Sequence, residues 1–150
     1  MIRKAYMTIL GTVLALGLLV FVPSARADLA NQATRLTFNQ SVDLPNHEAL
    51  PAGTYWFVVD PTIPNVVHVY NADRMQPVTT LMSIPTIRAN RTDRTQLTFS
   101  EQPKGEPIAL VKWYYPDRLT GHEFLYSSRR ESQMSEENKV TVLAMPPQAG

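Results

Sequence analysis

The 150-residue chain contains no cysteine. Disulfides, thiolate metal sites, a cysteine nucleophile and lipid attachment at a lipobox cysteine are therefore excluded. Glycine is scarce as well, at six residues, and none of them forms a phosphate-binding loop, a dinucleotide fingerprint or a nucleophile elbow. The zinc signature H-E-x-x-H is also missing. These absences argue against nucleotide-dependent chemistry, and we expect no cofactor.

Neither sign of charge dominates the composition. Lys and Arg number 14 and Asp and Glu number 13, which gives a net charge of +1. Nucleic acid and anionic membrane surfaces are bound by concentrated basic patches, and the sequence has no such run. Nucleic acid is therefore not an expected partner.

The first 27 residues have the pattern of a secretion signal. Arg3 and Lys4 form a basic start, residues 7–22 form an apolar run, and Ala25-Arg26-Ala27 forms an A-x-A cleavage site. The run ends at a proline and is shorter than the roughly 20 apolar residues that span a bilayer. We therefore predict cleavage before Asp28, export to the periplasm or the extracellular medium, and no stable membrane insertion afterwards.

Residues 28–150 are expected to form one β domain, because this length suits a single hydrophobic core. Short alternating apolar runs separated by Pro, Gly, Asn and Asp are typical of antiparallel strands. We predict strands over 34–42, 54–60, 66–70, 78–84, 95–100, 108–115, 122–126 and 139–145. About eight strands favour an antiparallel β-sandwich, with a small β-barrel as the alternative.

Three local signals refine this prediction. Asn71-Ala72-Asp73-Arg74 is expected to form a hairpin loop, and Pro77 to lie at an edge or a bulge because it cannot donate to a central ladder. Ser128 and Glu131 have the spacing of a capping box. They predict one short helix over 128–137.

Several segments resemble one family of proteins. They are Asn31-Gln32-Ala33-Thr34, Leu36-Thr37-Phe38, Leu50-Pro51-Ala52-Gly53-Thr54-Tyr55 and Gly121-His122-Glu123-Phe124-Leu125-Tyr126. Together they resemble a family of small exported β-rich proteins of soil bacteria, over most of the mature chain. The family has no assigned activity, so the resemblance implies export and a β fold, and it transfers no catalytic residue.

The histidines are one candidate site. His68 and His122 fall on predicted strands, Glu123 follows His122, and His47 lies in a loop. Imidazole and carboxylate together bind zinc or copper. The alternative is that His122 shares a strand face with aromatic residues and only hydrogen-bonds within the sheet.

Aromatic side chains are a second candidate, because rings exposed on a sheet can stack on sugars. Alternation along 108–115 predicts that Trp113 and Tyr115 share a core-facing side with Val111 and Ala109. Tyr114 would then point to the opposite face. Tyr114 and Trp56 are therefore the aromatic residues expected as exposed contacts.

A third candidate is the arginine group Arg88, Arg91 and Arg94. Three guanidinium groups in one loop could bind a carboxylate or a phosphate. The alternative is a charged, solvated connection between strands.

No catalytic motif emerges from the sequence, so we predict that the protein is not an enzyme. We expect an exported binding module that contacts an envelope or extracellular protein through a strand edge or a loop surface. The alternative is a module that binds a small ligand, either a carbohydrate or a metal.

Overall fold

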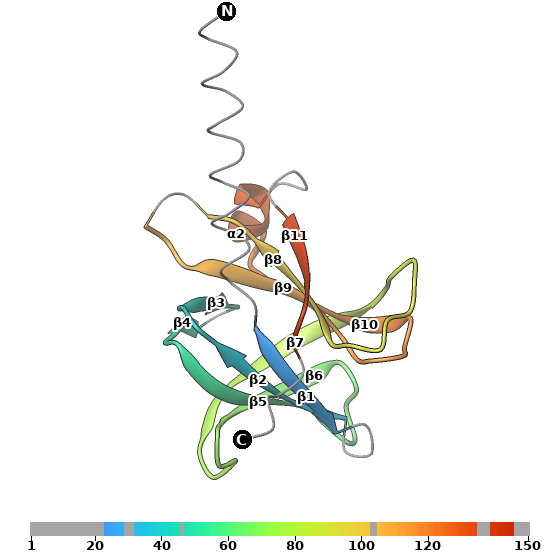
Figure 1. Cartoon of the computed structure of the whole chain (residues 1–150). Helices are drawn as coiled ribbons and strands as arrows, with labels where there is room; N and C mark the ends of the chain where they lie inside the picture. The colour runs from blue at the N-terminus through green and yellow to red at the C-terminus, as the bar shows by residue number, and fades with distance from the viewer. Residues whose placement is uncertain (1–22, 29–31, 46, 103–104, 135–138, 146–150) are drawn as a thin grey trace, which may run out of the picture.

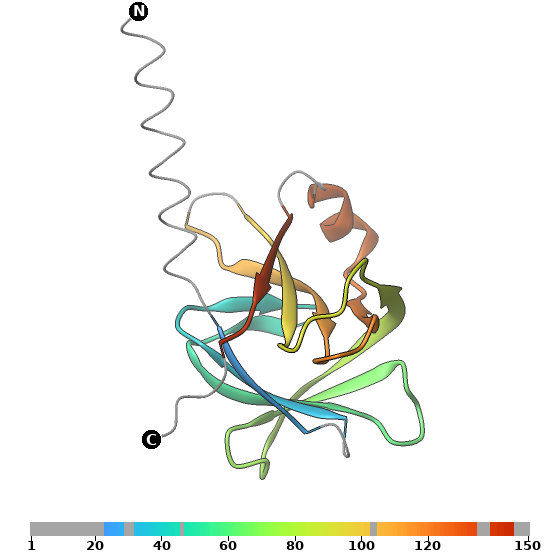
Figure 2. The same ribbon diagram turned by 45° about the vertical axis from the view of Figure 1, so that its right-hand side comes forward.

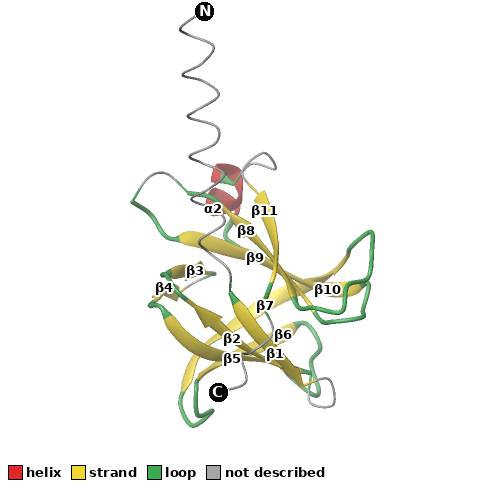
Figure 3. Cartoon of the chain, viewed as in Figure 1, coloured by secondary structure: helices red, strands yellow, loops and turns green. Residues whose placement is uncertain are grey.

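Nearly all regular structure in the described residues is β-strand (Figure 3). The computed structural model describes residues 23–28, 32–45, 47–102, 105–134 and 139–145. The elements are β1 (Ser24–Asp28), β2 (Ala33–Phe38), β3 (Val42–Leu44), β4 (His47–Leu50), β5 (Gly53–Val59), β6 (Val66–Asn71), β7 (Pro77–Ile87), β8 (Gln96–Ser100), β9 (Ile108–Tyr114), β10 (Thr120–Phe124), α2 (Ser128–Gln133) and β11 (Lys139–Leu143). The predicted all-β class is confirmed.

The strands form two curved layers that share β7 (Figure 1). The first layer has the order β1-β2-β5-β6-β7. In the second layer β7 pairs with β10 and β10 with β9, and β9 also contacts β3 and β8. All pairings are antiparallel except that of β3 with β9. The layers face each other across the core (Figure 2), as in a sandwich, and the path of strands is open.

β7 connects the layers because it changes partner along its length. Its first half pairs with β6, and its second half, up to Ile87, pairs with β10. The ladder with β6 is irregular where Pro77 lies opposite Tyr70, as the missing N–H of proline predicted. The hairpin loop over 71–74 is also confirmed, with the Arg74 N–H donating to the Asn71 carbonyl at 3.0 Å.

The core lies between the layers and is rich in aromatic side chains. Trp113 is fully buried, with its ring centroid 6.0 Å from that of Phe57. Tyr115 belongs to the same cluster, as predicted. Ala109 and Val111, predicted on the same face, are buried as well but lie outside this cluster. In the β8–β9 ladder Thr98 pairs with Lys112 and Phe99 with Leu110, so Val111 is skipped and Leu110 joins the cluster.

Helix α2 begins at Ser128, as predicted, but ends at Gln133, before the predicted end at residue 137. The cap is Ser127, not Ser128, and its hydroxyl accepts a hydrogen bond from the Arg130 N–H. Residues 135–138 of the predicted helix lie outside the described residues. The Arg130 guanidinium reaches Asp43 at 2.9 Å and so ties the helix to β3. Within the described ranges, no helix is long and apolar enough to cross a membrane.

The strands differ from the prediction at several places, and the strand predicted over 122–126 lies at residues 120–124 as β10. The predicted strand over 34–42 is divided into β2 and β3, and β4 was not predicted. β1 lies where the sequence predicts the end of the leader, and its last two residues, Ala27 and Asp28, flank the predicted cleavage point. Residues 1–22 of the predicted leader are outside the described part of the chain.

Candidate functional site

The predicted metal ligands do not converge. Val67 and Val69 of β6 are buried, so His68 between them points to the outer face of the first layer. His122 stacks on the core residue Trp113, and its neighbour Glu123 therefore points to the opposite face of β10. No group of three or more His, Cys, Asp or Glu in the described residues could hold a metal ion. The side chain of His47 lies outside the described part.

His68 has a structural partner instead. Its Nε2 lies 2.8 Å from Asp60 Oδ2, and its Nδ1 lies 3.1 Å from the Thr80 hydroxyl. The other Asp60 oxygen accepts the N–H groups of Thr62 and Ile63, each at 2.8 Å. The hydrogen bond from His68, with those two N–H groups, lowers the pKa of Asp60 to about 2. This network fixes the loop between β5 and β6.

The predicted aromatic contacts have structural surroundings as well. Tyr114 is only 3 % exposed, so its predicted exposure is wrong. Its ring occupies the space where Gly121 of β10 has no side chain, and its hydroxyl lies 3.3 Å from that of Thr86. Trp56 is half-buried and donates to the Ala72 carbonyl at 2.9 Å, while the Arg74 guanidinium lies 3.8 Å from its ring centroid.

The three predicted arginines serve different parts of the fold. Arg88 is 7 % exposed, and its guanidinium donates to the carbonyls of Arg118 at 2.7 Å and Tyr115 at 2.8 Å. Arg94 donates to the carbonyls of Leu143 and Ala144 beside β11. Arg91 is exposed. The prediction that these residues form one anion site is therefore wrong, because two of them bind backbone carbonyls in different directions.

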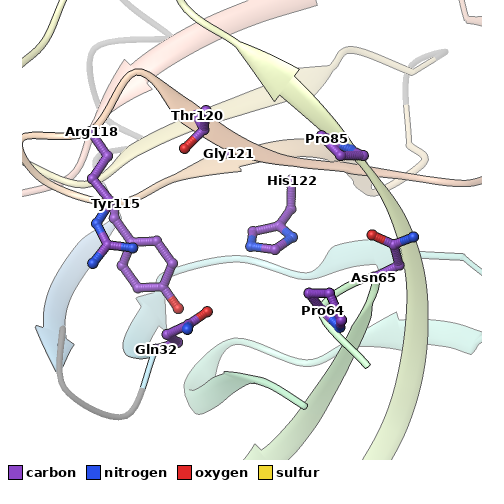
Figure 4. A pocket seen from close by; sticks show the side chains of 9 residues that line it. All are labelled: Gln32, Pro64, Asn65, Pro85, Tyr115, Arg118, Thr120, Gly121 and His122. Atoms are coloured by element: carbon purple, nitrogen blue, oxygen red, sulfur yellow. The ribbon is translucent and has the colours of Figure 1, made fainter. Parts of the chain in front are cut away.

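A cleft of about 250 Å³ lies between the two layers (Figure 4). Its walls come from four separate segments: the residue before β2, the β5–β6 loop, the second half of β7, and the end of β9 with the start of β10. The lining residues are Gln32, Pro64, Asn65, Pro85, Tyr115, Arg118, Thr120, Gly121 and His122.

His122 is the central side chain of this cleft, and its ring points between Tyr115, Gln32, Pro64 and Asn65 (Figure 4). The imidazole stacks on Trp113 with a centroid distance of 5.2 Å, and its Nδ1 lies 3.1 Å from the Ser83 hydroxyl. Burial lowers the pKa of His122 below its usual 6.5. Burial therefore favours the neutral form of the imidazole.

Arg118 supplies the positive charge at the cleft. Its guanidinium lies 5.6 Å from the ring centroid of Tyr115. Arg88 fixes the loop that carries Arg118, because its guanidinium donates to the backbone carbonyls of both Tyr115 and Arg118. The buried arginine thus positions the exposed one.

Of the lining residues, only His122 was predicted from the sequence as a candidate ligand. Gln32, Asn65 and Arg118 lie in turns far apart in the sequence, and no spacing motif connects them. Comparisons with protein families, with curated proteins and with solved structures found no match to this chain.

Proposed function

We propose that this chain is an exported, non-enzymatic binding module that takes a small carboxylate-bearing ligand in the cleft around His122. The observation that carries the proposal is the convergence of His122, Arg118, Asn65 and Gln32 on one concave space. A cleft with a few convergent polar groups and a titratable residue of shifted pKa is the usual form of a ligand site.

The chemistry of the walls indicates the class of ligand. Arg118 offers a cation suited to a carboxylate, while neutral His122 and the amides of Asn65 and Gln32 offer hydrogen bonds. Pro64 and Pro85 offer apolar surface. The volume of about 250 Å³ is below the roughly 300–1,000 Å³ of sites for larger ligands. We therefore infer a compact ligand with a carboxylate and an apolar body.

The same geometry favours binding over catalysis. Ser83 and His122 are hydrogen-bonded, but Ser83 is 2 % exposed, and its hydroxyl also lies 3.2 Å from the Asn65 carbonyl. A nucleophilic serine must reach the reacting carbon of its substrate. Ser83 is better explained as the residue that orients the imidazole.

Benzoate titration followed by NMR tests the proposal, with benzamide as the neutral probe of the same shape. We expect benzoate to shift the His122 ring signals and the amide signals of the lining residues, and benzamide to bind at least several-fold more weakly. Arg118→Gln should remove this preference, because it removes the charge that recognises the carboxylate.

Arg91→Gln is the matched control, since Arg91 is also exposed but does not line the cleft. It should bind benzoate like the unmodified protein. Equal binding of benzoate and benzamide, or no shift at the cleft with either probe, would contradict the proposed ligand class.

Protein interaction is a second candidate function, favoured by an apolar strip on the outer face of β7 and β10. Met82 and Ile84 of β7 are 51 % and 44 % exposed, and Leu125 is 37 % exposed. Leu125 directly follows β10, and its N–H donates to the Met82 carbonyl, so the three side chains adjoin. Contiguous exposed apolar residues often mark a protein contact, whereas isolated ones are ordinary.

Cross-linking in the native host with a C-terminally tagged chain tests this second function. Ile84→Glu should abolish a cross-linked partner, while Ile63→Glu, at an isolated isoleucine that is 53 % exposed, should retain it. A partner that survives Ile84→Glu contradicts the role of the strip.

A further inference from the structure

The strand β1 lies at the edge of the first layer and contains the predicted cleavage point. It pairs with β2 through five residue pairs, from Ser24 with Thr37 to Asp28 with Ala33. Cleavage after Ala27 would remove four of the five β1 residues. Once the leader is removed, the chain therefore has no β1 strand of its own to pair with β2.

The segment removed also contributes to the core and to a second edge. Ala25 is 9 % exposed and belongs to the core cluster. Its N–H donates to the Met145 carbonyl at 3.0 Å, and the Met145 N–H donates to the Pro23 carbonyl at 2.8 Å. The segment thus fills a slot between β2 and the residues that follow β11, and its loss would leave that slot open.

The edge of β2 has few of the features that prevent strand addition. Residues 33–38 contain no proline and no glycine, and their one charged residue, Arg35, is exposed. Natural edge strands are usually protected by proline, by inward-pointing charge or by a bulge. β-Branched Thr34 and Thr37 beside apolar Leu36 instead favour strand pairing.

Thr34 adds a separate indication of what the edge binds. Its hydroxyl is buried and has no hydrogen-bond partner among the described residues. In the β1–β2 ladder Thr34 pairs with residue 27, an alanine, a residue type without a hydrogen-bonding side chain. Residues directly opposite each other share a face. A strand with a serine at that position could therefore satisfy the Thr34 hydroxyl.

We propose that the β2 edge of the processed protein is a strand-acceptor site for an extended segment of a partner polypeptide. The segment pairs antiparallel with residues 33–37, places a small apolar residue at the position of Ala25, and places a hydroxyl residue at the position of Ala27. The proposal is independent of the ligand in the cleft, because it concerns backbone pairing at the opposite side of β2 from β5.

The test uses the full chain with a C-terminal tag, exported and processed by its bacterial host. The intact mass identifies the N-terminus, which should be Asp28. The probe is a fluorescent peptide with the sequence of residues 22–29. We expect it to bind, and Ala27→Ser in the peptide to strengthen binding by about 2- to 10-fold, the effect of one added hydrogen bond.

Two variants make the result specific. Thr34→Val in the protein should abolish the gain from the serine peptide, because it removes the hydroxyl that the serine would meet. Ala25→Arg in the peptide should weaken binding by more than about tenfold, since that position is in the core.

A processed chain that is unfolded alone and folds when the peptide is added also supports the proposal. A mature chain that still contains Ser24, one that binds no peptide, or one that stays unfolded with the peptide overturns it. The benzoate titration monitors the NMR signals of the cleft residues, whereas the peptide assay monitors the β2 edge. Failure of the strand-acceptor proposal can therefore be told apart from failure of the ligand proposal.

Discussion

Two arginines of the same loop differ mainly in how deeply they are buried. Arg88 and Arg91 are three positions apart in one loop, yet Arg88 is almost fully buried and Arg91 is exposed. Burial lowers the pKa of the Arg88 guanidinium. Backbone carbonyls of Tyr115 and Arg118 accept its hydrogen bonds and offset the desolvation. Arg88 is thus a structural residue that positions the cleft loop.

Arg88→Gln should lower the free energy of unfolding by about 2–3 kcal/mol, because it leaves buried carbonyls without a charged donor. Urea unfolding followed by circular dichroism measures this change. Arg91→Gln should stay within about 0.5 kcal/mol of the unmodified protein, as for most exposed sites. Equal effects of the two substitutions would contradict the structural role of Arg88.

Among the strands, the paths of β7 and β9 determine which of their side chains enter the core and which line the cleft. β7 passes from one layer to the other, so Pro85 in its second half lines the cleft while Leu81 in its first half is in the core. The irregularity in the β8–β9 ladder places Leu110, and not Val111, in the main core cluster. A shift of one residue moves every following side chain to the other face.

β11 is held at its end by the side chain of Arg94. Among the described strands it pairs only with β8, and Arg94 donates to the carbonyls of Leu143 at 3.1 Å and Ala144 at 2.8 Å at its end. Arg94→Gln should therefore lower the hydrogen-exchange protection of residues 139–143, measured by NMR. Protection of β5 in the first layer should not change. Loss of protection throughout the chain would show global destabilisation instead.

For the whole molecule, two groups with lowered pKa link stability to pH. Burial lowers the pKa of His122 below 6.5, and hydrogen bonds lower that of Asp60 from 3.8 to about 2. In both cases the unfolded chain binds the proton more readily. The stabilisation is therefore complete above the unfolded pKa and is lost as the pH falls towards the folded pKa.

We expect the free energy of unfolding to fall in two ranges, first below pH 6.5 and then between pH 3.8 and about 2. His122→Phe should remove the first decline, and Asp60→Asn the second. Urea titrations at a series of pH values, with NMR titration of the imidazole, measure both. An imidazole pKa at or above 6.5 in the folded protein would contradict the first part.

The order of apolar and polar residues was sufficient to predict the β class, most strands, the hairpin at 71–74 and the irregularity at Pro77. These features depend on local alternation, turn residues and a missing N–H, which a sequence displays directly. The burial of Trp113 followed for the same reason. Export, cleavage of the leader and the resemblance to a family of exported proteins of soil bacteria stay predictions.

Tertiary structure alone decided which side chains meet. Opposite faces separate His68 from His122, a gap at Gly121 accommodates Tyr114, and backbone carbonyls hold Arg88. The cleft combines residues from position 32 to position 122. Strand pairing joins such distant segments, and a sequence without spacing motifs carries no local sign of that register. The physical reason is that register and burial are properties of the packed layers and not of any one segment.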